Sequence, residues 1–367
     1  MFVQMPVTAV LLALGIALLV TPLVRKFAFK CGAVDCPNKR KVHKELMPRL
    51  GGLAIYLSFV ATVLITQNVN LQIAGLIFGG SLIVVLGFID DTRGVSPRVK
   101  LAGQVLAACA VAVAPFDLQV KFLTGPFSSE VIALGMLSIP VTVLWLVSVT
   151  NAVNLIDGLD GLAGGTSFIA LLTLAAAVGI EIARTGGSPG QVDAVILALI
   201  LAGAVLGFLR YNFFPARIFL GDSGSMFLGF SVAVLSIMGL AKGATFISVI
   251  IPVVILGIPL LDTVFAIIRR YCGHKPIFQP DKEHLHHKLL EMGLSHPQVV
   301  LCIYAVNVVL GLSAIVLTLI TQKQAVLFLA MLSTIILIAA NKVGVTGTER
   351  QASYLTQPEK QHHISRM

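Results

Sequence analysis

The chain consists of apolar segments separated by short polar loops, and this pattern constrains its fold more than any other feature. Of its 367 residues, 57% are hydrophobic and 12% are charged, whereas about a quarter of the residues of a soluble protein are charged. Eleven segments approach the length of about 20 mostly apolar residues that a membrane span needs: 6–24, 50–67, 71–89, 99–115, 131–149, 161–182, 191–209, 223–241, 245–268, 298–320 and 324–341. The sequence therefore predicts an all-α, polytopic integral membrane protein with about 11 transmembrane helices. Residues 1–341 form its single domain, and residues 342–367 form a polar tail.

The basic residues predict the orientation of these spans. If the loop after the first span is cytoplasmic, that side holds 22 of the 26 Lys and Arg residues. The opposite side holds only 4, namely Lys121, Arg184, Lys242 and Lys323. Cytoplasmic loops carry an excess of Lys and Arg, so we expect the N-terminus outside and the C-terminus in the cytoplasm. The same rule explains the net charge of +9 without a nucleic-acid partner.

Polar side chains gather in loops on the predicted cytoplasmic side. Acidic, amide and histidine residues occur in four clusters: Asp90-Asp91; Asn151, Asn154, Asp157 and Asp160; Asn212 and Asp222, with Phe219 between them; and Asp281, His284, His286 and His287. The second cluster repeats every three residues, which places its members on one side of a helix or a tight turn. Charged groups at a membrane are costly and usually mark a functional site. We therefore expect the clusters to bind something together.

The residue types in these clusters indicate a hard cation and a phosphate-bearing ligand. Carboxylate and amide oxygens suit Mg²⁺, and Mn²⁺ is an alternative. Mg²⁺ is usually held by one or two carboxylates together with substrate phosphates, and the nearby Lys and Arg residues can neutralise such phosphates.

Each cluster alone also has an ordinary explanation. Asp90-Asp91 can cap a helix, Gly-Asp-Ser-Gly-Ser is a common turn, and the histidines can form a solvated loop. Asp262 can pair with Arg269 or Arg270, or belong to the site.

Taken together, the motifs resemble those of the polyprenyl-phosphate N-acetylhexosamine-1-phosphate transferases. The resemblance covers about residues 32–297 and rests on the following motifs: His43-Lys44-x-x-x-Pro48-x-x-Gly51-Gly52; Asp90-Asp91 with Lys100; Asn151-x-x-Asn154-x-x-Asp157-Gly158-x-Asp160-Gly161; Asn212 ahead of Phe219-x-Gly221-Asp222-x-Gly224-Ser225; and His284-x-His286-His287. Residues 1–341 would then form one catalytic domain.

The histidine segment resembles one branch of this family more than another. The branch that uses UDP-GlcNAc has a similar motif to the one found here, in which Phe278-Gln279-Pro280-Asp281 precedes His284-x-His286-His287. The corresponding segment of the phospho-MurNAc-pentapeptide transferases resembles a run of three consecutive histidines. In this sequence Leu285 interrupts such a run. The resemblance implies transfer of GlcNAc-1-phosphate from UDP-GlcNAc to undecaprenyl phosphate, with UMP released. It further implies a bacterial plasma-membrane enzyme whose site faces the cytoplasm and which initiates a surface polysaccharide or teichoic acid.

The resemblance also implies roles for individual residues. Asp222, Asp90 and Asp91 would hold Mg²⁺, with Asp90 either a base or a positioning group. His286, His287 and Lys100 would contact phosphates or nucleotide. The remaining substrate-binding candidates are Asn151, Asn154, Asp157, Asp160, Asn212, Phe219, His284 and Arg269.

Alternatives remain open at this point. Another sugar nucleotide, or UDP-MurNAc-pentapeptide, can be the donor within the same family. An ion-coupled secondary transporter also carries intramembrane acids, although its acids would not all gather at one face. A homodimer is possible only by analogy.

Overall fold

The computed structural model describes residues 4–35, 46–125, 131–240, 246–272 and 284–344. Thirteen α-helices, one 3₁₀ helix and four short strands occur in these ranges. In chain order they are α1 (Gln4–Cys31), β1 (Val34–Asp35), β2 (Met47–Pro48), α2 (Gly51–Thr66), α3 (Leu71–Arg93), α4 (Pro97–Ala112), β3 (Phe122–Thr124), β4 (Val131–Ala133), η1 (Gly135–Leu137), α5 (Ser138–Leu155), α6 (Leu162–Thr185), α7 (Pro189–Asn212), α8 (Gly221–Gly239), α9 (Phe246–Ile255), α10 (Gly257–Cys272), α11 (Leu285–Glu291), α12 (His296–Leu319) and α13 (Gln322–Lys342). His43, Lys44 and residues 278–283 of the sequence motifs lie outside the described residues, as does the predicted tail after its first three positions.

Local sequence signals begin several of these helices. Capping boxes precede α7, α12 and α13, where Ser188, Ser295 and Thr321 pair with a glutamine three residues later. Asn70 accepts a hydrogen bond from the Ile73 amide at the start of α3, at 3.0 Å. These side chains satisfy backbone amides that a helix leaves unpaired at its first turn.

Eight helices in the described ranges are long and apolar enough to cross a membrane, or nine if the bent pair α9–α10 forms one span. This finding supports a multi-pass membrane protein, while the count of eleven and the orientation stay predictions. The predicted spans 50–67 and 99–115 correspond to α2 and α4, which have 16 residues each. At 1.5 Å per residue, about 24 Å of helix is shorter than the roughly 30 Å hydrocarbon core.

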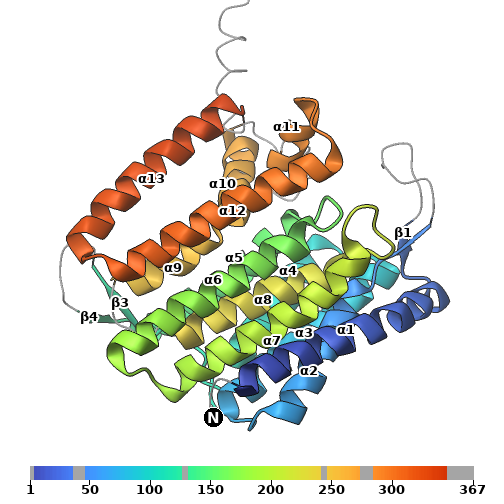
Figure 1. Ribbon diagram of the computed structural model, residues 1–367, viewed down its shortest axis with the longest axis horizontal. Helices are drawn as coiled ribbons and strands as arrows, with labels where there is room; N and C mark the ends of the chain where they lie inside the picture. Colours follow the sequence, from blue (N-terminus) through green and yellow to red (C-terminus); the bar gives the residue numbers. More distant parts are fainter. Residues whose placement is uncertain (1–3, 36–45, 126–130, 241–245, 273–283, 345–367) are drawn as a thin grey trace, which may run out of the picture.

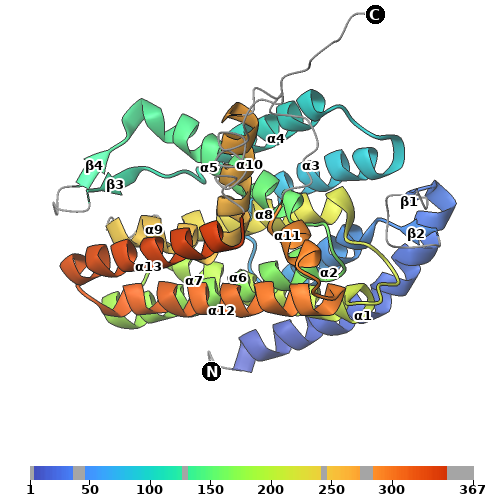
Figure 2. The ribbon, with the colours of Figure 1, turned by 90° about the horizontal axis from the view of Figure 1, so that it is seen from above.

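Two predicted spans are not single straight helices over their predicted lengths. The span predicted over 131–149 starts instead with β4 and η1, and α5 runs from Ser138 to Leu155. The span predicted over 245–268 is two helices bent by 81°. Pro259 has no amide hydrogen for the Ile255 carbonyl four residues earlier and crowds it, which ends α9 there. The bend turns α10 away from the direction of α9 (Figure 2).

The bundle is organised around α8, which is buried along nearly its whole length. α8 contacts α3, α5, α7, α2 and α6, and α1 covers α7 and α2 on the outside. Figure 1 shows α6, α7 and α8 running in similar directions, with α12 packed beside α6 and α13 at the outer edge. α13 buries only Ala325, as expected for a helix whose apolar side chains face lipid.

Candidate active site

Helix ends that are distant in sequence meet at one end of the bundle, and their polar side chains form a cluster around Lys100. The Lys100 ammonium lies 3.0 Å from the Asp90 carboxylate and 2.9 Å from the Asp222 carboxylate. It also donates to Asn154 Oδ1 at 3.4 Å. Asp90 ends α3, Lys100 begins α4, Asn154 ends α5 and Asp222 begins α8. Oxygen atoms from three helices therefore converge on one cation supplied by a fourth.

Asn154 and the backbone hold the two carboxylates in place. Asn154 Nδ2 donates to Asp222 Oδ1 at 2.7 Å and to the Ser225 hydroxyl at 2.8 Å. Asp90 Oδ1 accepts the amide of Val95 at 2.7 Å. Each carboxylate thus uses one oxygen for a fixed neighbour and directs the other towards Lys100.

Asp91 has a different environment from Asp90 although the two are adjacent. It is buried, and its two oxygens accept the amides of Asp222 and Ser223 at 2.9 and 3.0 Å. These amides belong to the first turn of α8, whose N–H groups need acceptors. A carboxylate there is also favoured by the helix dipole. Asp91 therefore anchors the N-terminus of α8 and fixes the position of Asp222.

The close approach of α3 and α8 requires a glycine. A Cβ atom at Gly87 would lie 2.4 Å from the backbone of Ser223. A contact that short cannot be relieved by rotating a side chain, because the neighbouring atoms are backbone. The absence of a side chain at Gly87 lets Asp91, one turn later on α3, reach the α8 amides.

Arg49 belongs to the same site, although the sequence indicated only its contribution to orientation. Its guanidinium lies 3.7 Å from Asp91 and 3.7 Å from Asp35. Its position just before the Gly51-Gly52 pair was the signal that could have identified it. Arg49 supplies a second positive charge on the side of Asp91.

Asn151 and its partner Gln104 form a buried amide pair beneath the cluster. Asn151 Nδ2 donates to Gln104 Oε1 at 2.6 Å, and Gln104 Nε2 donates to Asn151 Oδ1 at 3.3 Å. Gln104 is 1% exposed, so this pair joins α4 to α5 inside the bundle. Sequence reasoning missed Gln104 because a lone amide in an apolar segment carries no distinctive spacing.

Asp160 and Asn212 join two loops beside the cluster. Asp160 Oδ2 accepts the Ala216 amide at 3.0 Å, and the Asp160 amide donates to His296 Nε2 at 2.9 Å. Asn212 accepts the Gly161 amide at 3.2 Å and donates to the Ile218 carbonyl at 3.0 Å. These contacts hold the segment between α5 and α6 against the segment between α7 and α8.

Asp157 lies in the segment between α5 and α6, and Phe219 lies in the segment between α7 and α8. The Phe219 backbone pairs with Pro48 and Gly51 at 2.8 and 2.9 Å, and its side chain is half-buried. Asp157 is half-buried in the loop after α5. Burial, followed by repulsion from Asp222 and Asp91, raises the pKa of Asp157 to about 8. The Asp157 carboxyl is therefore mostly protonated at pH 7.

The histidines lie on and next to α11. His286 is buried, and its Nε2 lies 2.4 Å from where a Cβ of Gly158 would stand. The ring centroids of His286 and His287 are 4.2 Å apart. Burial, followed by repulsion from His287, lowers the pKa of His286 to about 3. His286 is thus neutral at pH 7 and adjoins the Asp157 loop. Arg269 lies half-buried on α10.

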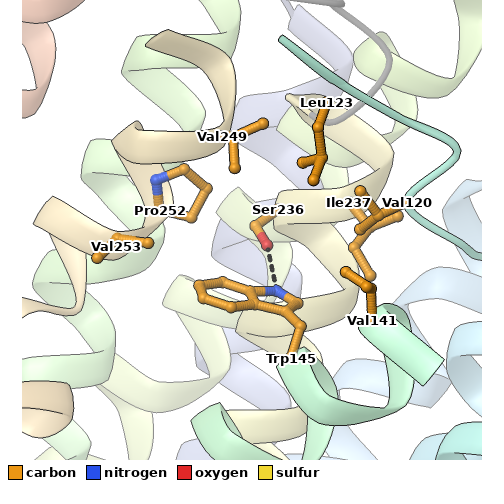
Figure 3. A pocket seen from close by; sticks show the side chains of 9 residues that line it. All are labelled: Val120, Leu123, Val141, Trp145, Ser236, Ile237, Val249, Pro252 and Val253. Carbon is orange, nitrogen blue, oxygen red and sulfur yellow. Dashed lines mark hydrogen bonds between the residues drawn. The ribbon is translucent and has the colours of Figure 1, made fainter. Parts of the chain in front are cut away.

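A cavity of about 100 Å³ lies towards the far ends of α5 and α8. Its lining is apolar except for Ser236, whose hydroxyl accepts a hydrogen bond from Trp145 Nε1 at 3.1 Å (Figure 3). Val141, Pro252 and Val253 complete much of its wall. Such a lining suits hydrocarbon rather than nucleotide.

The fold and the site define a multi-pass membrane protein with a carboxylate-rich site at one end of its helix bundle. Residues 73–240 match the model of glycosyl transferase family 4. A probable undecaprenyl-phosphate N-acetylglucosaminyl 1-phosphate transferase of Bacillus subtilis is 44% identical, over 90% of this chain and 89% of the relative.

More distant relatives carry related names. A decaprenyl-phosphate N-acetylglucosaminephosphotransferase of Mycobacterium tuberculosis is 36% identical, over 77% of this chain and 74% of its own. An undecaprenyl-phosphate alpha-N-acetylglucosaminyl 1-phosphate transferase of Escherichia coli K12 is 30% identical, over 75% and 73%. This chain belongs to glycosyl transferase family 4, in agreement with the resemblance found from its motifs.

Proposed function

We propose that this protein transfers GlcNAc-1-phosphate from UDP-GlcNAc to undecaprenyl phosphate. An oxygen of the lipid phosphate attacks the β-phosphorus of UDP-GlcNAc, the bond from that phosphorus to the bridging oxygen breaks, and UMP leaves. The lipid product is undecaprenyl-diphospho-GlcNAc, from which a cell-surface polysaccharide or teichoic acid is built. Family membership supports the reaction class, and the convergence of Asp90, Asn154 and Asp222 on Lys100 is the observation that carries it.

We propose Mg²⁺ as the cofactor, with Mn²⁺ able to use the same oxygen donors. In the part of the chain that the structure describes, no three His, Cys, Asp or Glu side chains gather to hold a metal by themselves. Mg²⁺ usually needs only one or two carboxylates, because phosphates and water complete its shell. Asp90 and Asp222, which already face a shared cation, fit that requirement. A bound Mg²⁺ would neutralise charge on the diphosphate of the donor.

The arrangement favours a role for Asp90 in positioning the metal and the acceptor phosphate over a role in removing a proton from that phosphate. The second pKa of a phosphate monoester is near 6, so the acceptor phosphate is largely ionised at pH 7. Asp90 is then not needed as a base. Lys100, between Asp90 and Asp222, would place positive charge where the transferred phosphate carries negative charge. Asp91 acts indirectly by fixing the first turn of α8.

The location of the site fits substrates that arrive from different phases. Under the positive-inside rule, the cluster faces the cytoplasm, where UDP-GlcNAc is dissolved. The acceptor headgroup lies at the surface of the same leaflet. Asp157, Asp160, Asn212 and Phe219 border the loops beside the cluster and are our candidates for the nucleoside side of the site.

Purified full-length protein tests this function. It should release UMP from UDP-GlcNAc only when undecaprenyl phosphate is present, and excess EDTA should stop the reaction. UMP release from UDP-MurNAc-pentapeptide instead would overturn the donor assignment. Counterflow uptake into vesicles without a lipid-linked product would favour a transporter.

A pair of variants locates the activity in the cluster. Asp222→Ala should abolish UMP release, because it removes one of the two carboxylates that face Lys100. Asp193→Asn is the matched control, since Asp193 bonds Asn70 at 2.7 Å near the opposite ends of α7 and α3. Near-normal turnover in Asp222→Ala would remove Asp222 from its role.

A further inference from the structure

α10 carries a buried carboxylate that the proposed reaction does not use. Asp262 is 3% exposed, and both of its oxygens are engaged. Asp262 Oδ2 lies 2.8 Å from His284 Nδ1, and Oδ1 accepts the Leu285 amide at 3.0 Å. A buried carboxylate is costly unless its oxygens are hydrogen-bonded. The two bonds therefore form a fixed connection between α10 and the start of α11.

This connection organises the beginning of α11. His284 is the residue before the helix and has an extended backbone, but its own side chain makes no capping bond. Asp262 instead supplies an acceptor for the first helical amide, from a different helix. A carboxylate accepts hydrogen bonds, so this contact suits the His284 tautomer that carries its hydrogen on Nδ1. The orientation of the His284 ring is fixed by that bond.

The His284 ring lies next to His286 and His287, of which His286 adjoins the Asp157 loop. The rings of His284 and His286 are parallel within 3°, with centroids 5.9 Å apart. His286 in turn packs against Gly158, the residue after Asp157. A continuous series of contacts thus leads from Asp262 through His284 and His286 to the Asp157 loop.

The bend between α9 and α10 makes this series possible. α10 packs against α5 and α12, and α11 also packs against α12. Figure 2 shows α10 lying across the direction of α12 and α13, near α11. A straight continuation of α9 would carry Asp262 elsewhere, because the two helices differ in direction by 81°.

We propose that Asp262 is a positioning residue for the transfer reaction. Its carboxylate fixes His284 and the first amide of α11, and thereby holds His286 and His287 against the loop that carries Asp157. This inference rests on the proposed function and assigns a role to a side chain that does not touch the substrates.

Two pairs of variants test the connection in the full-length enzyme. Asp262→Ala removes both bonds. His284→Asn keeps an amide nitrogen near the position of Nδ1, whereas His284→Gln moves that nitrogen beyond it. The first readout is kcat and KM for UMP release with Mg²⁺, UDP-GlcNAc and undecaprenyl phosphate. The second is hydrogen exchange of the amides of 285–291, with Asp193→Asn as the control.

The expected result separates positioning from general destabilisation. Because a misplacement of about 1 Å can cost about 100-fold, we expect Asp262→Ala and His284→Gln to lower kcat by about 10- to 100-fold. KM for UDP-GlcNAc should stay within about threefold, since the loss lies in the transition state. His284→Asn should lower kcat less than His284→Gln does, since its bond to Asp262 remains. The 285–291 amides should exchange faster in Asp262→Ala, while the α8 amides keep their wild-type rates.

Other results would overturn the inference. Wild-type kcat and unchanged exchange in Asp262→Ala would show that α11 is held by other contacts. Equal losses of kcat in His284→Asn and His284→Gln would show that the Nδ1 bond does not contribute to the reaction. This comparison tests the proposal even if Asp262→Ala does not fold. If the wild-type protein releases no UMP, the proposed function fails. Hydrogen exchange then still shows whether Asp262 orders α11.

Discussion

The contact between Gly52 and Gly224 offers a sharp test of how closely the bundle sets the position of Asp222. Gly52 lies in the first turn of α2, and Gly224 lies two residues after Asp222 in the first turn of α8. A Cβ at Gly52 would stand 2.0 Å from Cα and N of Gly224, whereas ordinary contact begins at 3.4 Å. Gly52→Ala therefore requires α2 and α8 to part by about 1.4 Å, because backbone atoms cannot rotate away.

The size of this displacement sets the expected effect. Overpacking a buried contact costs roughly 1–3 kcal/mol of the free energy of unfolding. A shift of about 1 Å in Asp222 is expected to lower kcat by about 100-fold. The assays are UMP release and thermal unfolding of the purified protein in detergent.

A matched glycine provides the control for Gly52→Ala. Gly179 lies inside α6, and nothing stands within 4 Å of its added Cβ. Alanine in a helix interior is more stable than glycine by roughly 0.5–1 kcal/mol, so Gly179→Ala should keep full activity and unfold at an equal or higher temperature. Wild-type kcat and an unchanged unfolding temperature in Gly52→Ala would refute the claim that this contact positions Asp222.

Three further predictions follow from the charges of the site. Lys100→Met leaves the Asp90 and Asp222 carboxylates without their shared cation. Without divalent ions it should lower the free energy of unfolding by about 3–5 kcal/mol, and Mg²⁺ should raise its unfolding temperature more than that of the wild type. An equal effect of Mg²⁺ on both proteins would contradict this. The pKa of Asp157 rises from 3.8 to about 8 on folding. The folded state therefore binds this proton more tightly than the unfolded state, which adds stability at low pH. That added stability is lost as the pH rises from about 4 to about 8. The unfolding temperature of Asp157→Asn should then fall less than that of the wild type between about pH 5 and 8.5, and equal falls would disprove the assignment. Because the pKa of His286 is lowered to about 3, the neutral variant His286→Gln should release UMP faster at pH 7.5 than the cationic variant His286→Lys. The reverse order would show that a charge is needed there.

The helical segments and the chemical character of the site are predictable from the sequence. Each described segment predicted to span the membrane contains a helix, because about 20 apolar residues between polar loops favour helical backbone in lipid. Asp90, Asn154 and Asp222 were recognisable because polar side chains are costly at a membrane unless they have partners. Those are local properties, readable from neighbouring residues.

Which partner each carboxylate binds depends on the packing of the bundle. Asp90 and Asp91 look equivalent in the sequence, yet one faces Lys100 and the other binds the first turn of α8. Asp262 had two candidate basic partners nearby in the chain, and its observed partner is His284, 22 residues further along the sequence.

Sequence alone thus determined which segments are helical and which loops are polar, since hydropathy is a property of neighbouring residues along one chain. Only the tertiary structure decided which carboxylate meets which donor. That choice depends on where helices bend and how closely glycines let them approach, and both are set by contacts between residues far apart in the sequence.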